Sequence, residues 1–203
     1  MLYRPRAISL WQDIISKILP TGDHSTMLLP QPQFPFDDQT WIISDTHFFH
    51  ENIGRYCDRP DGWQQMIIEN WNRLIQPEEI VFHVGDLALG KREKIEDLAS
   101  LLNGKLYLMR GNHDRRSTGF YKRLGITLVP DPHRMGHPSG WTLIFSHRPL
   151  VPLEPGVLNL HGHIHNSVAP ELGARHVNLC VEVREYRPWR LGDMLAPNLA
   201  PSG

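Results

Sequence analysis

Residues 157–165 read Val-Leu-Asn-Leu-His-Gly-His-Ile-His, an apolar run that leads into three histidines at alternate positions. A short apolar run of this kind predicts a buried β-strand. Clustered histidines are poor strand residues, whereas an imidazole readily binds a metal or carries a proton near neutral pH. The stretch therefore predicts a buried strand whose carboxyl end delivers His163 and His165 to a chemical site.

Other apolar runs in the chain end in the same way. Polar residues follow them as Ser-Asp-Thr-His at 44–47, Gly-Asp at 85–86, Arg-Gly-Asn-His-Asp at 110–114 and Ser-His at 146–147. Taken singly, most of these segments are better explained as ordinary turns or caps. In open α/β sheets, however, ligands bind outside the carboxyl ends of the strands, so we expect these segments to meet. Their joint occurrence favours a metal site.

The chemistry of the collected side chains narrows the choice of ion. They offer carboxylates, imidazoles and an amide but no thiolate, a set that suits Mn²⁺, Fe or Zn²⁺ better than Cu(I) or an iron–sulfur cluster. Gly85, Gly111 and Gly162 stand beside these residues. Glycine permits a positive φ or a close backbone approach, which a tight turn carrying a ligand requires.

The remaining pattern predicts an alternation of strands and helices. Trp63, Ile67 and Trp71 share one helical face, which favours core packing, and Asp61 is expected to cap that helix. We expect strands over 41–43, 80–84, 106–109, 126–129, 141–145, 157–160 and 176–183, and helices over 63–74, 92–102 and 119–124. Strands that alternate with helices, followed by a strand-rich half, predict a layered α/β sandwich.

The first part of the chain has a different character. Apolar residues at helical spacing predict a short amphipathic helix over 9–19, and a proline-rich stretch without periodicity follows. We therefore expect an irregular N-terminal extension over 1–40 and one catalytic domain over 41–203. The helix is expected to pack on its own domain rather than on a partner or a membrane surface.

Composition argues against a strongly basic nucleic-acid binder, a CxxC site and a membrane-spanning protein. The 203 residues carry 21 basic and 22 acidic side chains, a balance that gives no overall attraction to nucleic acid or membranes. The two cysteines, Cys57 and Cys180, lie too far apart for a CxxC pair. No apolar run has the length of a membrane span. We expect a cytoplasmic protein without a membrane partner, and the sequence does not indicate its oligomeric state.

The polar segments, in this order, resemble the motifs of the calcineurin-like metallophosphoesterases. DxH (Asp45, His47), GD (Asp86), GNHD (111–114), SH (His147) and GHxH (His163, His165) are all present, and the resemblance covers roughly residues 41–182. The longer opening SDTHFFHEN is similar to a bacterial and phage subgroup of small phosphoesterases. The resemblance implies the metallophosphatase fold, an α/β layered β-sandwich of two mixed sheets flanked by helices.

The resemblance also implies a role for each motif residue. One metal would be held by Asp45, His47 and His165, and Asp86 would bridge to the second. The second metal would be held by Asn112, His147 and His163. His113 would stay unligated as the catalytic residue, and Asp114 would orient His113 or a turn. The residues expected to contact substrate are Asn112, His113, Arg148 and His50.

This resemblance implies a hydrolase with two divalent ions, Mn²⁺ first and Fe, Zn²⁺ or Ni²⁺ as alternatives. Two metals that share a carboxylate can activate water to hydroxide near neutral pH for in-line attack on phosphorus. Two dications with two aspartates and one hydroxide leave a site charge of ~+1, which attracts a phosphodiester without trapping it. We expect a phosphodiesterase rather than a monoesterase, acting on a small phosphoester.

Other functions stay open at this level. A nuclease is the main alternative, because basic side chains near the third motif could follow a nucleic-acid backbone, although the balanced total charge makes a solvated helix face a somewhat better explanation. This basic set is Arg110, Arg115, Arg116, Lys122 and Arg123. Nothing marks a phosphopeptide groove. A non-catalytic scaffold of the same fold is disfavoured, because such scaffolds lose ligands that this chain retains.

Overall fold

The computed structural model describes residues 33–199, which contain two β-sheets. The first sheet has five strands in the order β4-β3-β2-β1-β9. Parallel pairing joins β1 (Trp41–Ile43), β2 (Ile80–His83), β3 (Lys105–Met109) and β4 (Thr127–Val129), and β9 (Trp189–Arg190) runs antiparallel to β1. The parallel strands therefore release their polar carboxyl ends at one edge of this sheet.

The second sheet has four strands in the order β5-β6-β7-β8. Its strands β6 (Thr142–Ser146), β7 (Val157–His161) and β8 (His176–Asn178) are parallel, and β5 (His133–Gly136) pairs antiparallel with β6. Both sheets are thus mixed. The expected layered sandwich of two mixed sheets flanked by helices is confirmed.

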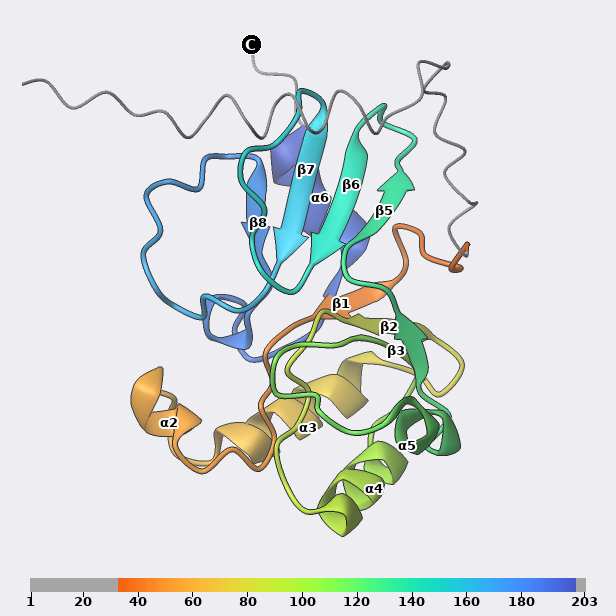
Figure 1. Cartoon of the computed structure of the whole chain (residues 1–203). Helices are drawn as coiled ribbons and strands as arrows, with labels where there is room; N and C mark the ends of the chain where they lie inside the picture. Colours follow the sequence, from red (N-terminus) through yellow and green to blue (C-terminus); the bar gives the residue numbers. More distant parts are fainter. Residues whose placement is uncertain (1–32, 200–203) are drawn as a thin grey trace, which may run out of the picture. The chain divides into compact units, whose positions relative to one another are not determined.

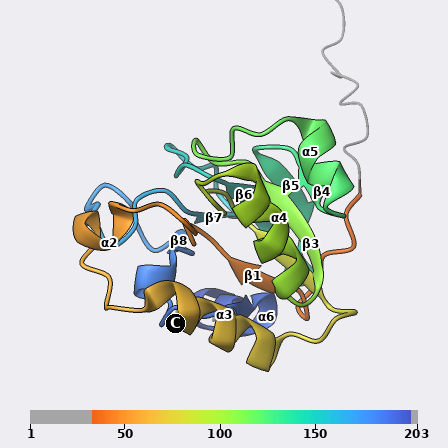
Figure 2. The same cartoon turned by 90° about the horizontal axis from the view of Figure 1, so that it is seen from below.

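Helices cover the first sheet on the side away from the second sheet (Figures 1 and 2). They are α3 (Trp63–Leu74), α4 (Arg92–Leu101) and α5 (Thr118–Arg123), while the short α2 (Ile53–Tyr56) precedes α3. Helix α6 (Leu191–Leu199) lies behind β6 and β7 in Figure 1. Alternation along each strand decides which side chain faces the helices. Ile43, Val81 and Leu108 belong to the same core cluster as Ile67 and Trp71 of α3.

The opposite faces of the strands join the two sheets through aromatic contacts. Phe82 of β2 lies 5.1 Å, between ring centroids, from Phe145 of β6. Phe36, which precedes β1, stacks on Phe82 at 4.5 Å. These rings are buried. Because aromatic rings bury a large apolar area, this contact fixes the spacing of the sheets beneath the polar strand ends.

The structure corrects two predicted boundaries. Asp61 does not cap α3, because the chain enters that helix through Gly62 in the left-handed conformation with φ of 72°. The strand predicted over 176–183 ends at Asn178, whose side chain accepts a hydrogen bond from the Cys180 amide and turns the chain. A 3₁₀ helix, η1 (Val181–Val183), follows in its place. The short strands β5 and β9 and the helices α2 and α6 were not predicted.

The N-terminal predictions have different outcomes. The helix expected over 9–19 lies outside the described residues, and the domain boundary at residue 40 stays a prediction. Residues 33–40 form turns and irregular chain without helix or strand. Within the part of the chain that the structure describes, none of the helices combines the length and apolar character of a membrane span.

The core of α3 provides a direct test of this packing. Ile67 is fully buried, whereas the neighbouring Met66 is 36% exposed. We expect Ile67→Ala to lower the free energy of unfolding by about 2–5 kcal/mol, because the vacated volume leaves a cavity. Met66→Ala should change it by less than ~1 kcal/mol. Urea unfolding followed by circular dichroism measures both, and equal effects would contradict the assigned helix face.

Candidate metal centre

The polar segments meet at the carboxyl ends of β1, β2, β3, β6 and β7. Backbone hydrogen bonds hold the first two segments together, because the Asp45 amide donates to the Gly85 carbonyl and the His47 amide to the Asp86 carbonyl. The His163 amide donates to Asp45 Oδ2 at 2.9 Å and attaches the second sheet. The predicted convergence of strand ends is therefore present.

Asp45, His47 and His165 form the first cluster of potential metal ligands. The Nε2 atom of His47 lies 3.6 Å from Asp45 Oδ1, and that of His165 lies 3.8 Å from the same oxygen. The other oxygen, Oδ2, accepts hydrogen bonds from the Ser44 hydroxyl and the Cys180 thiol as well as from His163. Asp45 thus has one oxygen fixed by the protein and one directed at the two imidazoles.

Asp86, His147 and His163 form the second cluster. The Nε2 atom of His147 lies 3.3 Å from Asp86 Oδ2 and 3.2 Å from the Asn112 side-chain oxygen. The ring centroids of His147 and His163 are 5.1 Å apart. The amide oxygen of Asn112 therefore points to the same space as these imidazoles.

One carboxylate oxygen lies close to a histidine of each cluster. Asp86 Oδ2 lies 3.4 Å from His47 Nε2 in the first cluster and 3.3 Å from His147 Nε2 in the second. The Oδ1 atom of Asp86 is occupied, because it accepts a hydrogen bond of 2.7 Å from the His113 amide. A single carboxylate oxygen thus stands between the two groups of ligands.

Several of these residues have a backbone conformation that non-glycine residues rarely adopt. The φ angles of Asp45, His47, Asp86, His163 and His165 lie between 51° and 72°. Such left-handed conformations cost of order 1–3 kcal/mol each and persist where the surrounding structure enforces them. They let a residue that directly follows a strand turn its side chain toward the common point. Concentrated strain of this kind is typical of a functional site.

Three glycines leave room for these ligands, as the sequence predicted. A Cβ atom at Gly85 would lie 2.3 Å from His147 Nδ1, and one at Gly111 would lie 2.1 Å from Asp86 Oδ1. At Gly162 it would lie 2.1 Å from Asp45 Oδ2. Gly85 also has a φ of 99°. At Gly111 and Gly162 the requirement is close approach, because a ligand side chain occupies the space of any Cβ.

Buried atoms without hydrogen-bond partners mark where an ion would fit. Asp45 Oδ1 and His47 Nε2 are buried and accept or donate no hydrogen bond. Unpaired buried polar atoms are unfavourable unless an ion or a water molecule satisfies them. Oxygen and imidazole donors suit divalent Mn, Fe, Ni or Zn. The residues present therefore fit divalent cations at both clusters.

The electrostatics agree with a site that attracts cations. Burial would raise the pKa of Asp45, but the adjacent His47 imidazole and the charges of His147 and His165 hold that pKa well below its usual range. Burial would lower the pKa of His147, but Asp86 and Asp45 raise it to about 9. The two buried carboxylates thus stabilise positive charge at this point.

Arg59 and Glu182 support the first cluster, and the sequence did not identify either. Arg59 donates to the carbonyls of Asp45 and Thr46 at 2.7 and 2.8 Å and to Glu182 Oε1. Glu182 Oε1 in turn lies 2.9 Å from His165 Nδ1. A carboxylate on the outer nitrogen fixes the orientation of a ligating imidazole. No local sequence signal marks Arg59, which lies far along the chain from its partner Glu182.

Asp114 and His83 form hydrogen bonds within the loops that carry the ligands, and neither residue belongs to the two clusters. Asp114 accepts hydrogen bonds from the amides of Asp86, Leu87 and Gly111, so it orients a turn, one of its two predicted tasks. His83 Nε2 is 2.9 Å from the Thr46 hydroxyl. Burial lowers the pKa of His83 to about 3, so its ring is neutral.

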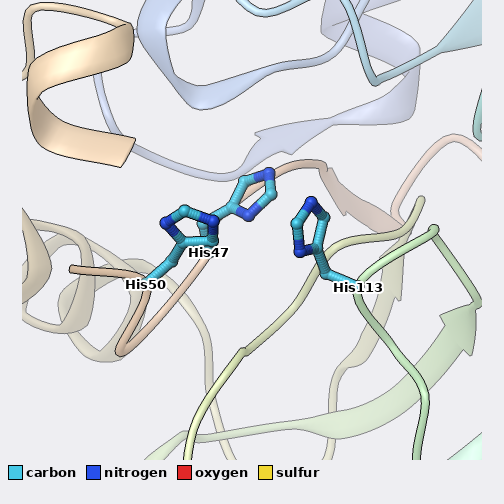
Figure 3. A group of neighbouring side chains, drawn as sticks. All are labelled: His47, His50 and His113. Atoms are coloured by element: carbon cyan, nitrogen blue, oxygen red, sulfur yellow. The ribbon is translucent and has the colours of Figure 1, made fainter. Parts of the chain in front are cut away.

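His113 and His50 lie beside the clusters and face a pocket. Figure 3 shows the rings of His47, His50 and His113 gathered from two loops. The centroid of His113 is 5.0 Å from that of His47 and 5.1 Å from that of His50. His50 Nδ1 accepts a hydrogen bond from the Ile53 amide, so it also holds the start of α2. Both histidines line a pocket of about 400 Å³ with Asn112, His163 and Tyr56.

Other residues of the predicted site lie further out. Arg148 is exposed and does not line that pocket, so its contact with substrate stays a prediction. The predicted basic set is dispersed. Arg110 donates to the Thr118 hydroxyl and Arg115 to the Asn112 carbonyl, while Arg116 donates to the Gly90 carbonyl.

Substitution at Gly162 tests the crowding around Asp45. We expect Gly162→Ala to weaken metal binding at least about tenfold, because the new methyl group displaces the Asp45 carboxylate. Gly173→Ala is the matched control, since nothing lies within 4 Å of a Cβ there. Metal content measured by mass spectrometry compares them. Full metal occupancy in Gly162→Ala would contradict the proposed role of Asp45.

Substitution at Glu182 tests the support of His165. Glu182→Gln removes the charge that faces the His165 ring, and we expect metal affinity to fall by about 10–100-fold. Glu185→Gln, at an exposed position in the same segment, should retain the original affinity. Titration with Mn²⁺ by calorimetry measures both. Identical affinities would show that Glu182 does not orient the ligand.

The chain is similar to several known proteins. The chain is 34% identical over 163 residues to the uncharacterized protein MJ1445 of Methanocaldococcus jannaschii, with 73% of this chain and 84% of that protein covered. Among solved structures it is similar to AQ665, a protein of unknown function from Aquifex aeolicus, with a TM-score of 0.59 and 26% identity over 73% of this chain and 93% of that one.

A nuclease from Pseudomonas putida, MPE, is more distant, with a TM-score of 0.44 and 22% identity over 63% of this chain and 62% of that one. The family model for calcineurin-like phosphoesterases matches residues 39–193, which include every residue of both clusters. The chain therefore belongs to the calcineurin-like phosphoesterase family of metal-dependent hydrolases.

Proposed function

We propose that this protein is a phosphodiesterase that uses two divalent metal ions, Mn²⁺ first, to hydrolyse a small phosphoester. The position of Asp86 carries the proposal. Its Oδ2 atom is within 3.4 Å of His47 Nε2 and within 3.3 Å of His147 Nε2, so one oxygen faces the ligands of both clusters. An oxygen in this place is suited to bridge two ions.

The protein side chains would hold the ions in two groups of three. Asp45, His47 and His165 would hold one ion, while Asn112, His147 and His163 would hold the other, with Asp86 shared. When bound, such a pair of ions activates water near neutral pH and stabilises charge that develops on the phosphoryl group. The fixed outer oxygens of Asp45 and Asp86 keep both carboxylates oriented without help from the ions.

The choice of ligands suits an anionic phosphoester such as a diester. The clusters contain two carboxylates, Asp45 and Asp86, and their other ligands are an amide and imidazoles, which bind metal ions in the neutral form. Two dications would therefore leave net positive charge, which attracts a phosphodiester monoanion. A cage made only of carboxylates would cancel that charge. The pocket of about 400 Å³ is within the range of small-molecule sites.

His113 is the residue best placed to act on the leaving group. It lines the pocket, belongs to neither of the two Asp–His–His clusters, and has its backbone fixed by the Asp86 carboxylate. Its imidazole can donate a proton to the departing alkoxide or a hydrogen bond to the phosphoryl oxygens. His50 lies 5.1 Å away between ring centroids and would contact the substrate from the other side.

Turnover of a chromogenic diester tests the proposal. We expect the protein loaded with Mn²⁺ to hydrolyse bis(4-nitrophenyl) phosphate, and His113→Ala to retain its metal while kcat falls by about 10²–10⁴-fold. His137→Ala serves as control, because His137 belongs to neither cluster, does not line the pocket and pairs with Asp38.

Metal analysis of the same samples completes the experiment. Two ions per chain are expected in the wild type and in both variants. Absence of turnover by the wild type with two bound ions would refute the phosphodiesterase assignment. Full turnover by His113→Ala would refute only the role of His113.

A further inference from the structure

A second groove adjoins the catalytic pocket. It has a volume of about 630 Å³, and its lining includes Phe49, Glu51, Leu89, Lys91 and Lys94. His50 lines both this groove and the catalytic pocket. A molecule whose reacting group lies at the metal centre could therefore extend past His50 into the groove.

The backbone fixes the groove relative to the metal centre. The loop after β1 pairs with the loop after β2, because the Phe48 amide donates to the Leu87 carbonyl and the Leu89 amide to the Phe48 carbonyl. The same two loops carry the ligands His47 and Asp86 a few residues earlier. Gly90 follows Asp86 by four positions, so their backbones are at most ~14 Å apart. This span is short enough for one small molecule or two linked nucleotides.

The charge of the groove favours an anion. Lys91 and Lys94 are exposed on its lining, and Glu51 is the acidic residue that faces them. Arg116 donates to the Gly90 carbonyl at 2.6 Å, which brings a third cation to the rim. Arg92 is less available, since it pairs with Glu96. Basic side chains therefore outnumber acidic side chains at this groove, although the net charge of the whole chain is close to zero.

An apolar surface accompanies these cations. Phe49 is half-buried, and the Lys94 ammonium lies 5.6 Å from the centre of its ring. The φ of Phe49 is 64°, and its amide donates to the Gln64 side chain, so the ring is held at the groove in an unusual conformation. A flat aromatic surface beside cations suits a planar base next to a phosphate.

We propose that this groove binds a second phosphate of the substrate, so that the preferred substrates are phosphoesters with a further phosphate and an attached base. Lys91 and Lys94 contact that phosphate, and Phe49 contacts the base. The inference rests on the proposed function, because the first phosphate is placed at the metal centre. The same pair of phosphates beside a base occurs in a pyrophosphate-linked nucleotide, where water would break the phosphoanhydride and release two monophosphates. It also occurs in a single-stranded oligonucleotide, where water would break a phosphodiester and release a phosphate end and a hydroxyl end.

The test compares three substrates with the Mn²⁺-loaded protein. The first is bis(4-nitrophenyl) phosphate, which has one phosphate. The second is ADP-ribose, and the third is a short single-stranded oligodeoxynucleotide. We measure the ratio of kcat/KM for each of the last two to that for the first. The double variant Lys91→Ala/Lys94→Ala should lower this ratio by about tenfold for at least one of them. Glu51→Gln should raise the same ratio.

Lys122→Ala is the matched control, because it removes an exposed lysine of α5 that does not line the groove. A loss with ADP-ribose alone supports the inference for small nucleotides, and a loss with the oligonucleotide supports it for nucleic acid. The inference is wrong if the ratios are unchanged, if Lys122→Ala changes them equally, or if the wild type cleaves neither two-phosphate substrate. Failure of the wild type on bis(4-nitrophenyl) phosphate instead refutes the proposed function.

Discussion

The Asp45 carboxylate is held by donors from three separate segments of the chain. Its Oδ2 atom accepts hydrogen bonds from the Ser44 hydroxyl, the His163 amide and the Cys180 thiol, while Oδ1 has no hydrogen-bond partner. The carboxylate therefore joins the two sheets and presents one free oxygen to His47 and His165. The position of every other ligand follows from this fixed point, because the strand ends must pack around it.

The close packing of ligands around Asp45 requires backbone conformations that are energetically unfavourable. Residues that follow the strands adopt left-handed backbone conformations, and glycines stand wherever a neighbouring ligand would meet a Cβ. Each such conformation is unfavourable on its own. The apolar contact between Phe82 and Phe145 beneath the site and the buried Arg59–Glu182 pair beside it provide stabilisation that keeps the turns in place.

The loops that carry the ligands also shape the surroundings of the site. Pairing of the loops after β1 and β2 sets His47 and Asp86 at one end and Phe49 and Gly90 at the other. A metal centre and an adjacent groove thus share one rigid support. In this arrangement, the groove side chains that we propose to contact the substrate, such as Lys91, are separate from the potential metal ligands.

The sequence by itself determined most of the strands, the order of the polar segments and the type of ligand. Apolar runs followed by Asp, Asn or His are local patterns, and local patterns predict strand ends. Tertiary structure decided which oxygen of Asp86 faces both clusters, and it brought Arg59 and Glu182 to His165 from positions distant in the chain. It also decided where the strand predicted through residue 183 ended, because the Asn178 side chain turns the chain there. The positions of Asp86, Arg59 and Glu182 depend on contacts between segments far apart in the sequence, and no local pattern encodes such contacts. The turn at Asn178 is a contact between neighbouring residues that the apolar pattern of the strand did not reveal.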